Sequence, residues 1–325
     1  MTTPAYRRRF LSTVLGTAAL AAAGAPFSGR AAAQGRVARS AGTRVRLGLN
    51  AYSFNEPLRA GTLTLDDVVD YCAQQGLDGL DATGYYFPGY PQVPDDAFLY
   101  RLKRRAFVNG VTISGTGVRN DFAVDDPAAR QRDVRMVKDW IEAAAKLGAS
   151  VVRIFAGQKV PAGGTFDRTL EWMIPDIKAC VDYGRQHGVI VGLQNHNDFV
   201  QTADEAIRIV EAVKSEWLGV ILDVGSLRQG DPYAEIEKLV PYAVTWQLKE
   251  SVWYGSKEVP TDVGRIKAII DRTGYRGFLP IETLGPGDPR VKVARFLDTV
   301  RQYFGTPGSA AVGGPRGYGT ITVLT

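Results

Sequence analysis

In this 325-residue chain, several short apolar runs end in polar side chains, and these are the residues best suited to chemistry. Asp223 follows one such run and Glu282 follows another, so we interpret these two carboxylates as functional. The chain has only two histidines and two cysteines, so any metal site must use mostly oxygen ligands. Further polar or aromatic candidates at or near the run ends are Tyr52, Tyr86, Arg119, Arg153, Gln194, Asn195, His196, Gln247, Lys249, Glu250 and Trp253.

Eight short apolar or β-branched runs, each followed by a stretch with helical spacing, must position these side chains. Val134, Val137 and Ile141 form one of the apolar stripes that indicate a helix. Gly148, Gly188 and Gly274 each follow a predicted helix, where a left-handed residue is expected. We predict strands at 47–52, 79–82, 112–117, 151–155, 189–194, 219–223, 243–249 and 278–282.

Eight strand–helix units in about 260 residues predict an α/β fold, a single-domain (β/α)8 TIM barrel over 45–305. A doubly wound sheet would carry a glycine-rich phosphate loop after its first strand, and residues 50–54 read Asn-Ala-Tyr-Ser-Phe. The carboxyl ends of barrel strands meet at one face, so the polar run ends should gather there. Period-two alternation places Gln247 and Lys249 on one side of their strand, and Gln194 and His196 on one side of theirs.

The N-terminal stretch 1–33 has the three zones of an export signal. Arg7-Arg8-Arg9-Phe10-Leu11 resembles a twin-arginine signal, and a mild apolar stretch then leads to Ala31-Ala32-Ala33, a small-residue cleavage site. This predicts export by the twin-arginine machinery to the periplasm or the medium. We expect a linker at 34–44 and a flexible C-terminal tail at 306–325.

The formal charge of +5 belongs mostly to the signal, because 1–33 holds four of the 39 basic residues and no acid. The remainder has 35 basic and 34 acidic residues, a net charge of +1, which argues against a nucleic-acid partner. The basic run Arg101 to Arg105 is interpreted as a solvated helix face. No later apolar run approaches the ~18 residues of a membrane span. The sequence leaves open whether the chain forms a homo-oligomer.

Four strings on successive predicted strands resemble the xylose isomerase-like barrels, and the resemblance covers about residues 45 to 305. They are Gly-Leu-Gln-Asn-His at 192–196, Ile-Leu-Asp-Val-Gly-Ser at 221–226, Trp-Gln-Leu-Lys-Glu at 246–250 and Pro-Ile-Glu-Thr at 280–283. That family includes sugar phosphate isomerases and epimerases, inosose dehydratases and isomerases, and ketose 3-epimerases.

The resemblance implies one divalent metal, often Mn2+ or Mg2+, held by Glu, Asp, His and Glu from strands five to eight. Asp223 and Glu282 match two of these ligands, whereas Gln194 occupies the position of the first Glu and Gln247 occupies the position of the His. Amide oxygens still suit Mn2+, Mg2+ or Ca2+, though they bind these cations more weakly than carboxylates do.

The resemblance also implies proton abstraction next to a carbonyl, which needs acid/base groups. Glu282 keeps one carboxylate, but the Gln194 amide cannot exchange a proton, so Lys249, His196 or Glu250 must act as the second group. We expect Tyr52, Tyr86, Arg119, Arg153, Asn195, Glu250 and Trp253 to bind substrate, the aromatic rings by packing on a sugar's apolar face.

These features predict an exported, metal-assisted isomerase or epimerase, or a related lyase, for an unphosphorylated sugar, cyclitol or glycoside. Export argues against sugar phosphates, which are chiefly cytoplasmic. The two lost ligands leave an alternative, a non-catalytic or degenerate sugar-binding barrel. A DNA-repair endonuclease shares the barrel, but it needs more histidine ligands and a basic groove.

Overall fold

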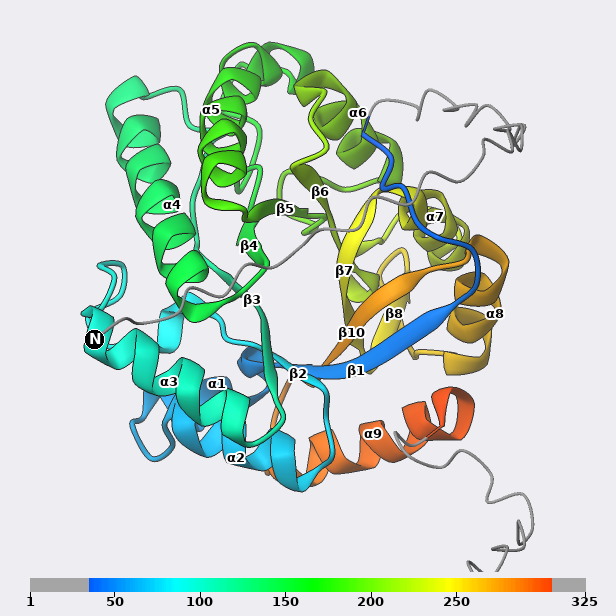
Figure 1. Cartoon of the computed structure of the whole chain (residues 1–325). Coiled ribbons are helices and arrows are strands. Elements are labelled where there is room, and N and C mark those ends of the chain that lie inside the picture. The colour runs from blue at the N-terminus through cyan, green and yellow to red at the C-terminus, as the bar shows by residue number, and fades with distance from the viewer. Residues whose placement is uncertain (1–34, 306–325) are drawn as a thin grey trace, which may run out of the picture. The chain divides into compact units, whose positions relative to one another are not determined.

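Eight parallel strands close into a barrel in the computed structural model, which describes residues 35–305 (Figure 1). The order around the barrel is β1-β10-β7-β6-β5-β4-β3-β2, and the (β/α)8 prediction is confirmed. The strands are β1 (Arg44–Asn50), β2 (Gly79–Asp81), β3 (Thr112–Gly117), β4 (Val151–Ile154), β5 (Ile190–Gln194), β6 (Leu218–Asp223), β7 (Ala243–Lys249) and β10 (Arg276–Glu282). All eight predicted strands are observed, with ends that shift by up to three residues.

Helices surround this barrel and pack on it through their apolar stripes (Figure 1). Val134, Val137 and Ile141 are buried, as their spacing predicts. Gly148 and Gly188 end their helices in the left-handed conformation. The helices are α1 (Asn55–Arg59), α2 (Leu65–Gln74), α3 (Asp96–Val108), α4 (Pro127–Leu147), α5 (Phe166–His187), α6 (Ala203–Val213), α7 (Pro232–Leu239), α8 (Val263–Thr273) and α9 (Pro289–Phe304), with short 3-10 turns η1 (Ala51–Phe54), η2 (Gly84–Tyr86), η3 (Val224–Ser226) and η4 (Val240–Tyr242).

An antiparallel hairpin, which the sequence reading missed, follows β7. It consists of β8 (Ser251–Tyr254) and β9 (Lys257–Pro260), with Tyr254 paired to Lys257 across a two-residue turn. Gly255 opens that turn at φ +64°, a conformation that favours glycine. The hairpin projects Trp253 and Glu258 over the barrel mouth, where both line a cavity.

Residues just before β1 lie against the barrel at the amino ends of its strands. Arg39 donates hydrogen bonds to the carbonyls of Ala243 and Arg276, the first residues of β7 and β10. Its guanidinium also lies 4.8 Å from the centre of the Tyr275 ring. The predicted signal at 1–33 and the predicted tail at 306–325 lie outside the described residues. Within 35–305, no helix combines the length and apolarity of a membrane span.

Candidate active site

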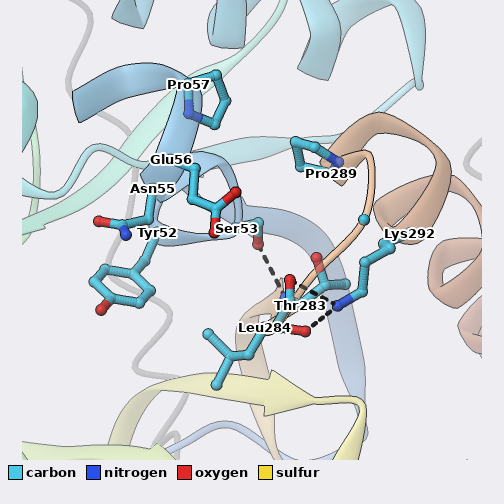
Figure 2. Close-up of a pocket in the computed structure, with 11 residues that line it drawn as sticks. Tyr52, Ser53, Asn55, Glu56, Pro57, Thr283, Leu284, Pro289 and Lys292 are labelled. Atoms are coloured by element: carbon cyan, nitrogen blue, oxygen red, sulfur yellow. Dashed lines mark hydrogen bonds between the residues drawn. The ribbon is translucent and has the colours of Figure 1, made fainter. Parts of the chain in front are cut away.

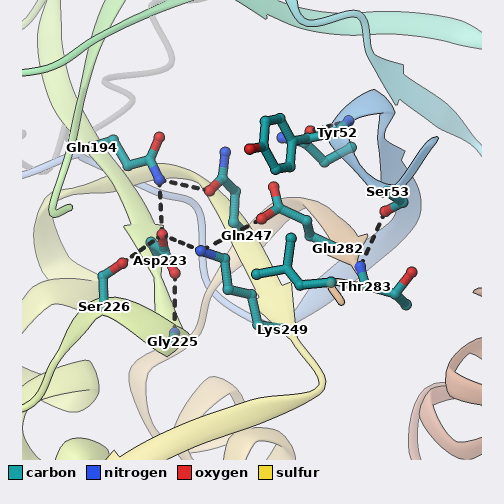
Figure 3. A network of polar contacts seen from close by, with 12 residues as sticks. Tyr52, Ser53, Gln194, Asp223, Gly225, Ser226, Gln247, Lys249, Glu282 and Thr283 are labelled. Carbon is teal, nitrogen blue, oxygen red and sulfur yellow. Dashed lines mark hydrogen bonds and ion pairs between the residues drawn. The ribbon is translucent and has the colours of Figure 1, made fainter. Parts of the chain in front are cut away.

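An ammonium group between two buried carboxylates lies at the carboxyl end of the barrel (Figure 3). Lys249 Nζ is 2.7 Å from Asp223 Oδ2 and 3.4 Å from Glu282 Oε1. The strand register brings these three side chains together. Glu282 on β10 pairs with Lys249 on β7, and Asp223 on β6 pairs with Gln247, which lies two residues before Lys249 on β7. The strand alternation that placed Gln247 and Lys249 on one face is thus confirmed.

Asp223 is held rigidly by hydrogen bonds on both of its oxygens. Ser226 Oγ donates to Oδ2 at 2.8 Å, and the backbone N–H of Gly225 donates to Oδ1 at 3.0 Å. Asn195 clamps the backbone, since its Nδ2 donates to the carbonyl of Asp223 and its Oδ1 accepts from the N–H of that residue. Asn195 is completely buried, so it positions Asp223 instead of presenting an edge to a substrate.

The two predicted amide ligands complete the cluster, but they bond to each other, and Gln194 also bonds to Asp223. Gln194 Nε2 donates to Asp223 Oδ2 at 2.7 Å and to Gln247 Oε1 at 2.8 Å (Figure 3). Gln194 Oε1 and Gln247 Nε2 are buried without a hydrogen-bond partner among the described residues. The four predicted ligands therefore lie together, with Gln194 turned toward Asp223 as a donor.

Burial and charge act in opposite directions on the three ionisable groups. Burial alone would raise the pKa of Asp223, but the charge and hydrogen bond of Lys249, together with His196 and Ser226, outweigh burial and lower it. Burial would lower the pKa of Lys249, but Asp223 and Glu282 outweigh burial and raise it. For Glu282, burial prevails over the attraction of Lys249 and raises the pKa. Asp223 and Lys249 thus form a charged pair beside a more basic carboxyl group.

These contacts do not fit a divalent cation among the predicted ligands. Both carboxylates already contact the Lys249 ammonium, and Gln194 turns N–H groups, not lone pairs, toward Asp223. A divalent ion 4 Å from an ammonium would be repelled by about 8 kcal/mol at an effective dielectric constant of 20. Among residues 35–305, no group of three or more His, Cys, Asp or Glu side chains is arranged to hold a metal. No reaction step is therefore assigned to a metal.

A cavity of about 330 Å³ opens onto Lys249 and Glu282. His196, predicted to face the mouth, lines this cavity, as do Glu250 and Trp253. His196 Nδ1 lies 2.9 Å from Asp198 Oδ2 at an angle that makes no hydrogen bond, and burial lowers the pKa of this imidazole. The cavity lining thus combines the Lys249 ammonium, the Glu282 carboxyl group, an imidazole and an indole.

A second cavity of about 310 Å³ shares Leu284 with the first (Figure 2). Tyr52 lines this second cavity together with Asn55, Glu56 and Lys292. Glu250 contacts this region as well, because its Oε2 accepts from the Leu284 N–H at 3.2 Å.

Four predicted substrate-binding residues lie outside the two cavities: the buried Asn195 described above, Tyr86, Arg119 and Arg153. Tyr86 Oη lies within hydrogen-bond distance of Asn55 Oδ1, at 3.0 Å, and burial raises its pKa. Arg119 is half-exposed and lies 3.9 Å from Asp198. Arg153 is buried, with its guanidinium 4.5 Å from the ring centre of Phe155.

Three residues near the mouth are not among the predicted site residues. Tyr85, not Tyr86, accepts a hydrogen bond from Arg153 Nη2 at 2.6 Å. Arg228 lines the first cavity and stacks on Trp253, with its guanidinium 4.1 Å from the ring centre, and Glu258 reaches the same cavity from β9. Recognition of the hairpin from its alternating residues and Gly255 turn would have pointed to Glu258.

Solved structures with the same barrel include several carbohydrate enzymes. D-psicose 3-epimerase with D-tagatose from Clostridium cellulolyticum H10 superposes with a TM-score of 0.67 at 16% identity, covering 80% of this chain and 99% of that one. The IolI protein with a bound zinc atom gives a TM-score of 0.64 at 16% identity, covering 80% and 99%. The probable 3-DHS dehydratase AsbF of petrobactin synthesis from Bacillus anthracis gives 0.60 at 16%, covering 79% and 97%.

At these identities the similarity shows the fold, and the sequence itself shows the family. A search of curated proteins finds no match. A sequence model described as "Xylose isomerase-like TIM barrel" matches residues 69–300, more than half of the chain. That stretch includes all four strings that resembled the family and the strands that carry Gln194, Asp223, Lys249 and Glu282. This chain therefore belongs to the xylose isomerase-like TIM barrel family.

Proposed function

We propose that this protein is an isomerase or epimerase, or a related lyase, that acts on an unphosphorylated sugar, cyclitol or glycoside. One observation carries the proposal: the Glu282 carboxyl and the Lys249 ammonium, 3.4 Å apart, both face the 330 Å³ cavity. A base beside a fixed positive charge suits proton removal from a carbon next to a carbonyl. Epimerases and a dehydratase among the solved structures of this fold are consistent with such chemistry.

Glu282 is the group that we assign to proton abstraction. Asp223 accepts four hydrogen bonds or ion-pair contacts, from Gln194, Gly225, Ser226 and Lys249. Among residues 35–305, the Glu282 carboxylate has only the longer contact with Lys249. Glu282 would take the C–H proton, and the electron pair would move to the carbonyl oxygen. After exchange with solvent, Glu282 would deliver a proton to the former carbonyl carbon, while the proton of the neighbouring hydroxyl moves to the enediolate oxygen. The neutral His196 imidazole on the cavity wall is the candidate for a second acid/base.

The cavities support a substrate larger than a single ring. Two spaces of about 330 and 310 Å³ meet at Leu284, with the Trp253 indole lining the first and the Tyr52 phenol ring lining the second. Rigid aromatic faces bordered by hydrogen-bonding groups suit sugar rings. A glycoside with its carbonyl-bearing ring beside Glu282 would fill both.

Incubation with candidate sugars, ketosugars and glycosides in D2O, followed by NMR, tests the proposal. We expect solvent deuterium to enter one carbon of a substrate, and Glu282→Gln to slow this exchange by roughly 100- to 10,000-fold, the range for a lost general base. Lys267→Gln, a change in a surface ion pair on α8, is the matched control. Full exchange by Glu282→Gln would refute the role of Glu282.

The alternative function is sugar binding without turnover, which the replacement of two family ligands by Gln194 and Gln247 favours. The same NMR samples separate the two functions. Ligand binding detected by line broadening, with no deuterium entering any sugar, would support the binding protein.

We also propose that the protein is exported through the twin-arginine machinery. The support is the Arg7-Arg8-Arg9-Phe10-Leu11 sequence and the small-residue site after it. Replacement of Arg7 and Arg8, the twin pair of the Arg-Arg-x-Phe-Leu pattern, by Lys should keep a tagged protein in the cytoplasmic fraction. Equal export of the variant would refute this route.

A further inference from the structure

The position of Lys249 points to a role more specific than acid/base exchange. Its ammonium lies among the four residues that align with the family's metal ligands, contacting Asp223 at 2.7 Å and Glu282 at 3.4 Å. Its side chain is only 12% exposed, and that exposed part faces the cavity. A fixed positive charge therefore occupies the place where the resemblance implies a divalent cation.

A neighbouring glycine makes room for this arrangement. A Cβ built on Gly225 would lie 2.6 Å from Lys249 Cδ, too close for two carbon atoms, and 3.2 Å from the carbonyl oxygen of Ser251. Gly225 has no positive φ in the structure, so backbone conformation does not call for glycine here. Close approach of the lysine stem is thus a reason for glycine at this position.

The charges of the cluster also balance. The implied family set has three ionisable groups that bind as anions, two Glu and one Asp, around a dication, which gives a net charge of −1. Here Asp223 and Glu282 surround one ammonium, and the neutral amides of Gln194 and Gln247 take the other two places, which again gives −1. The loss of one carboxylate at position 194 thus accompanies the exchange of a dication for a monocation.

We infer that Lys249 supplies the positive charge that a divalent metal would supply, so that this enzyme works without a metal. The inference rests on the proposed function. When Glu282 removes the proton, the carbonyl oxygen gains the electron pair and becomes an enediolate oxygen, and a Lys249 N–H donates a hydrogen bond to it. Glu282 then delivers a proton to the former carbonyl carbon, the proton of the neighbouring hydroxyl moves to the enediolate oxygen, and the carbon that first lost its proton becomes the new carbonyl, with no oxidant or reductant consumed.

Metal binding tests this inference without any knowledge of the substrate. Mn2+ is titrated into EDTA-treated full-length protein, and the free ion is measured by its EPR signal. We expect no binding by the wild type at 100 μM Mn2+, and measurable binding by Lys249→Ala, in which the carboxylates lose their ammonium. Binding of one Mn2+ per chain by the wild type, or equal binding by the two proteins, would overturn the inference. Lys267→Ala is the control, and thermal unfolding shows that each variant is folded.

A second experiment applies once deuterium exchange identifies a substrate. Turnover should persist in 5 mM EDTA and should not rise with added Mn2+, Mg2+ or Ca2+. Lys249→Ala should lower kcat by roughly 100- to 1,000-fold, as loss of an oxyanion donor does. Turnover that EDTA abolishes and Mn2+ restores would overturn the role of Lys249. If no sugar exchanges deuterium, the proposed function fails, while the Mn2+ titration still decides what occupies the cluster.

Discussion

Gly225→Ala should destabilise the protein through a clash with one identified side chain. The added Cβ would lie 2.6 Å from Lys249 Cδ, whereas ordinary contacts between carbon atoms are about 3.5–4.0 Å. The lysine stem would have to retreat by roughly 1 Å, which would also stretch its 2.7 Å contact with Asp223. Overpacking of this kind costs about 1–3 kcal/mol. We therefore expect the free energy of unfolding to fall by that amount.

A double-mutant cycle measured by urea unfolding isolates this contact. In the Lys249→Ala background the stem is gone, and the nearest atom left to the new Cβ is the carbonyl oxygen of Ser251 at 3.2 Å. We expect Gly225→Ala to cost under about 1 kcal/mol there, so that the coupling free energy between the two positions is about 1–2 kcal/mol. Gly115→Ala, whose Cβ would meet its neighbours at 3.4–3.5 Å, is the matched control.

Additive effects of the two substitutions would refute this reasoning. Additivity would mean that Gly225 is needed for the backbone of η3 and not for the position of Lys249. The lysine would then be free to leave the carboxylates, and the fixed-charge role would lose its steric support.

Three further predictions concern buried groups. Burial raises the pKa of Asp81 from 3.8 to about 6. Ionisation of this carboxyl therefore lowers the free energy of unfolding by its full amount above about pH 6 and has no effect on it below about pH 3.8. At pH 8 the free energy of unfolding of Asp81→Asn should therefore be about 3 kcal/mol higher than that of the wild type, whereas near pH 3.5 the two proteins should be equally stable. A variant as stable as the wild type at pH 8 would contradict this. Asn195→Ala should lower the free energy of unfolding by about 2–4 kcal/mol, because it leaves the buried N–H and carbonyl of Asp223 without hydrogen-bond partners. A raised KM with unchanged stability would instead indicate a substrate contact. Cys72 and Cys180 are free and buried, and burial raises the pKa of Cys180 to about 12, so neither should react with Ellman's reagent until the protein is unfolded in guanidinium.

The strands could be predicted where their carboxyl halves are buried, because a strand buried on both faces reads as an apolar run. The run before Asp223 and the run before Glu282 are examples, and each ends where the chain reaches the polar mouth. The hairpin β8–β9 was missed because it lies outside the barrel core. Its strands are only four residues each, and the turn between them is just Gly255-Ser256, so the alternation is too short to stand out from a loop.

The grouping of the site was also accessible from sequence, but the partners of each side chain were not. Alternation places Gln247 and Lys249 on the same face, yet it cannot fix where a flexible four-carbon stem ends. That end point depends on carboxylates from β6 and β10, which are 26 and 33 residues away from Lys249. Asn195 illustrates the same limit, because its polar type suggested a substrate contact while its partners are the backbone groups of a neighbouring strand.

A lysine at position 249 and a glutamine at position 194 should depend on each other in related sequences. A carboxylate at 194 beside Asp223 and Glu282 would give three anions, and one ammonium would leave a net charge of −2 in a buried cluster. That excess favours a dication and a protein without the lysine. Relatives with Glu at the 194 position should therefore carry a residue other than Lys at 249, and relatives with Lys should carry a neutral residue at 194. An alignment in which Glu and Lys commonly occur together would show that the two positions vary independently, and that the ammonium is not a replacement for the metal.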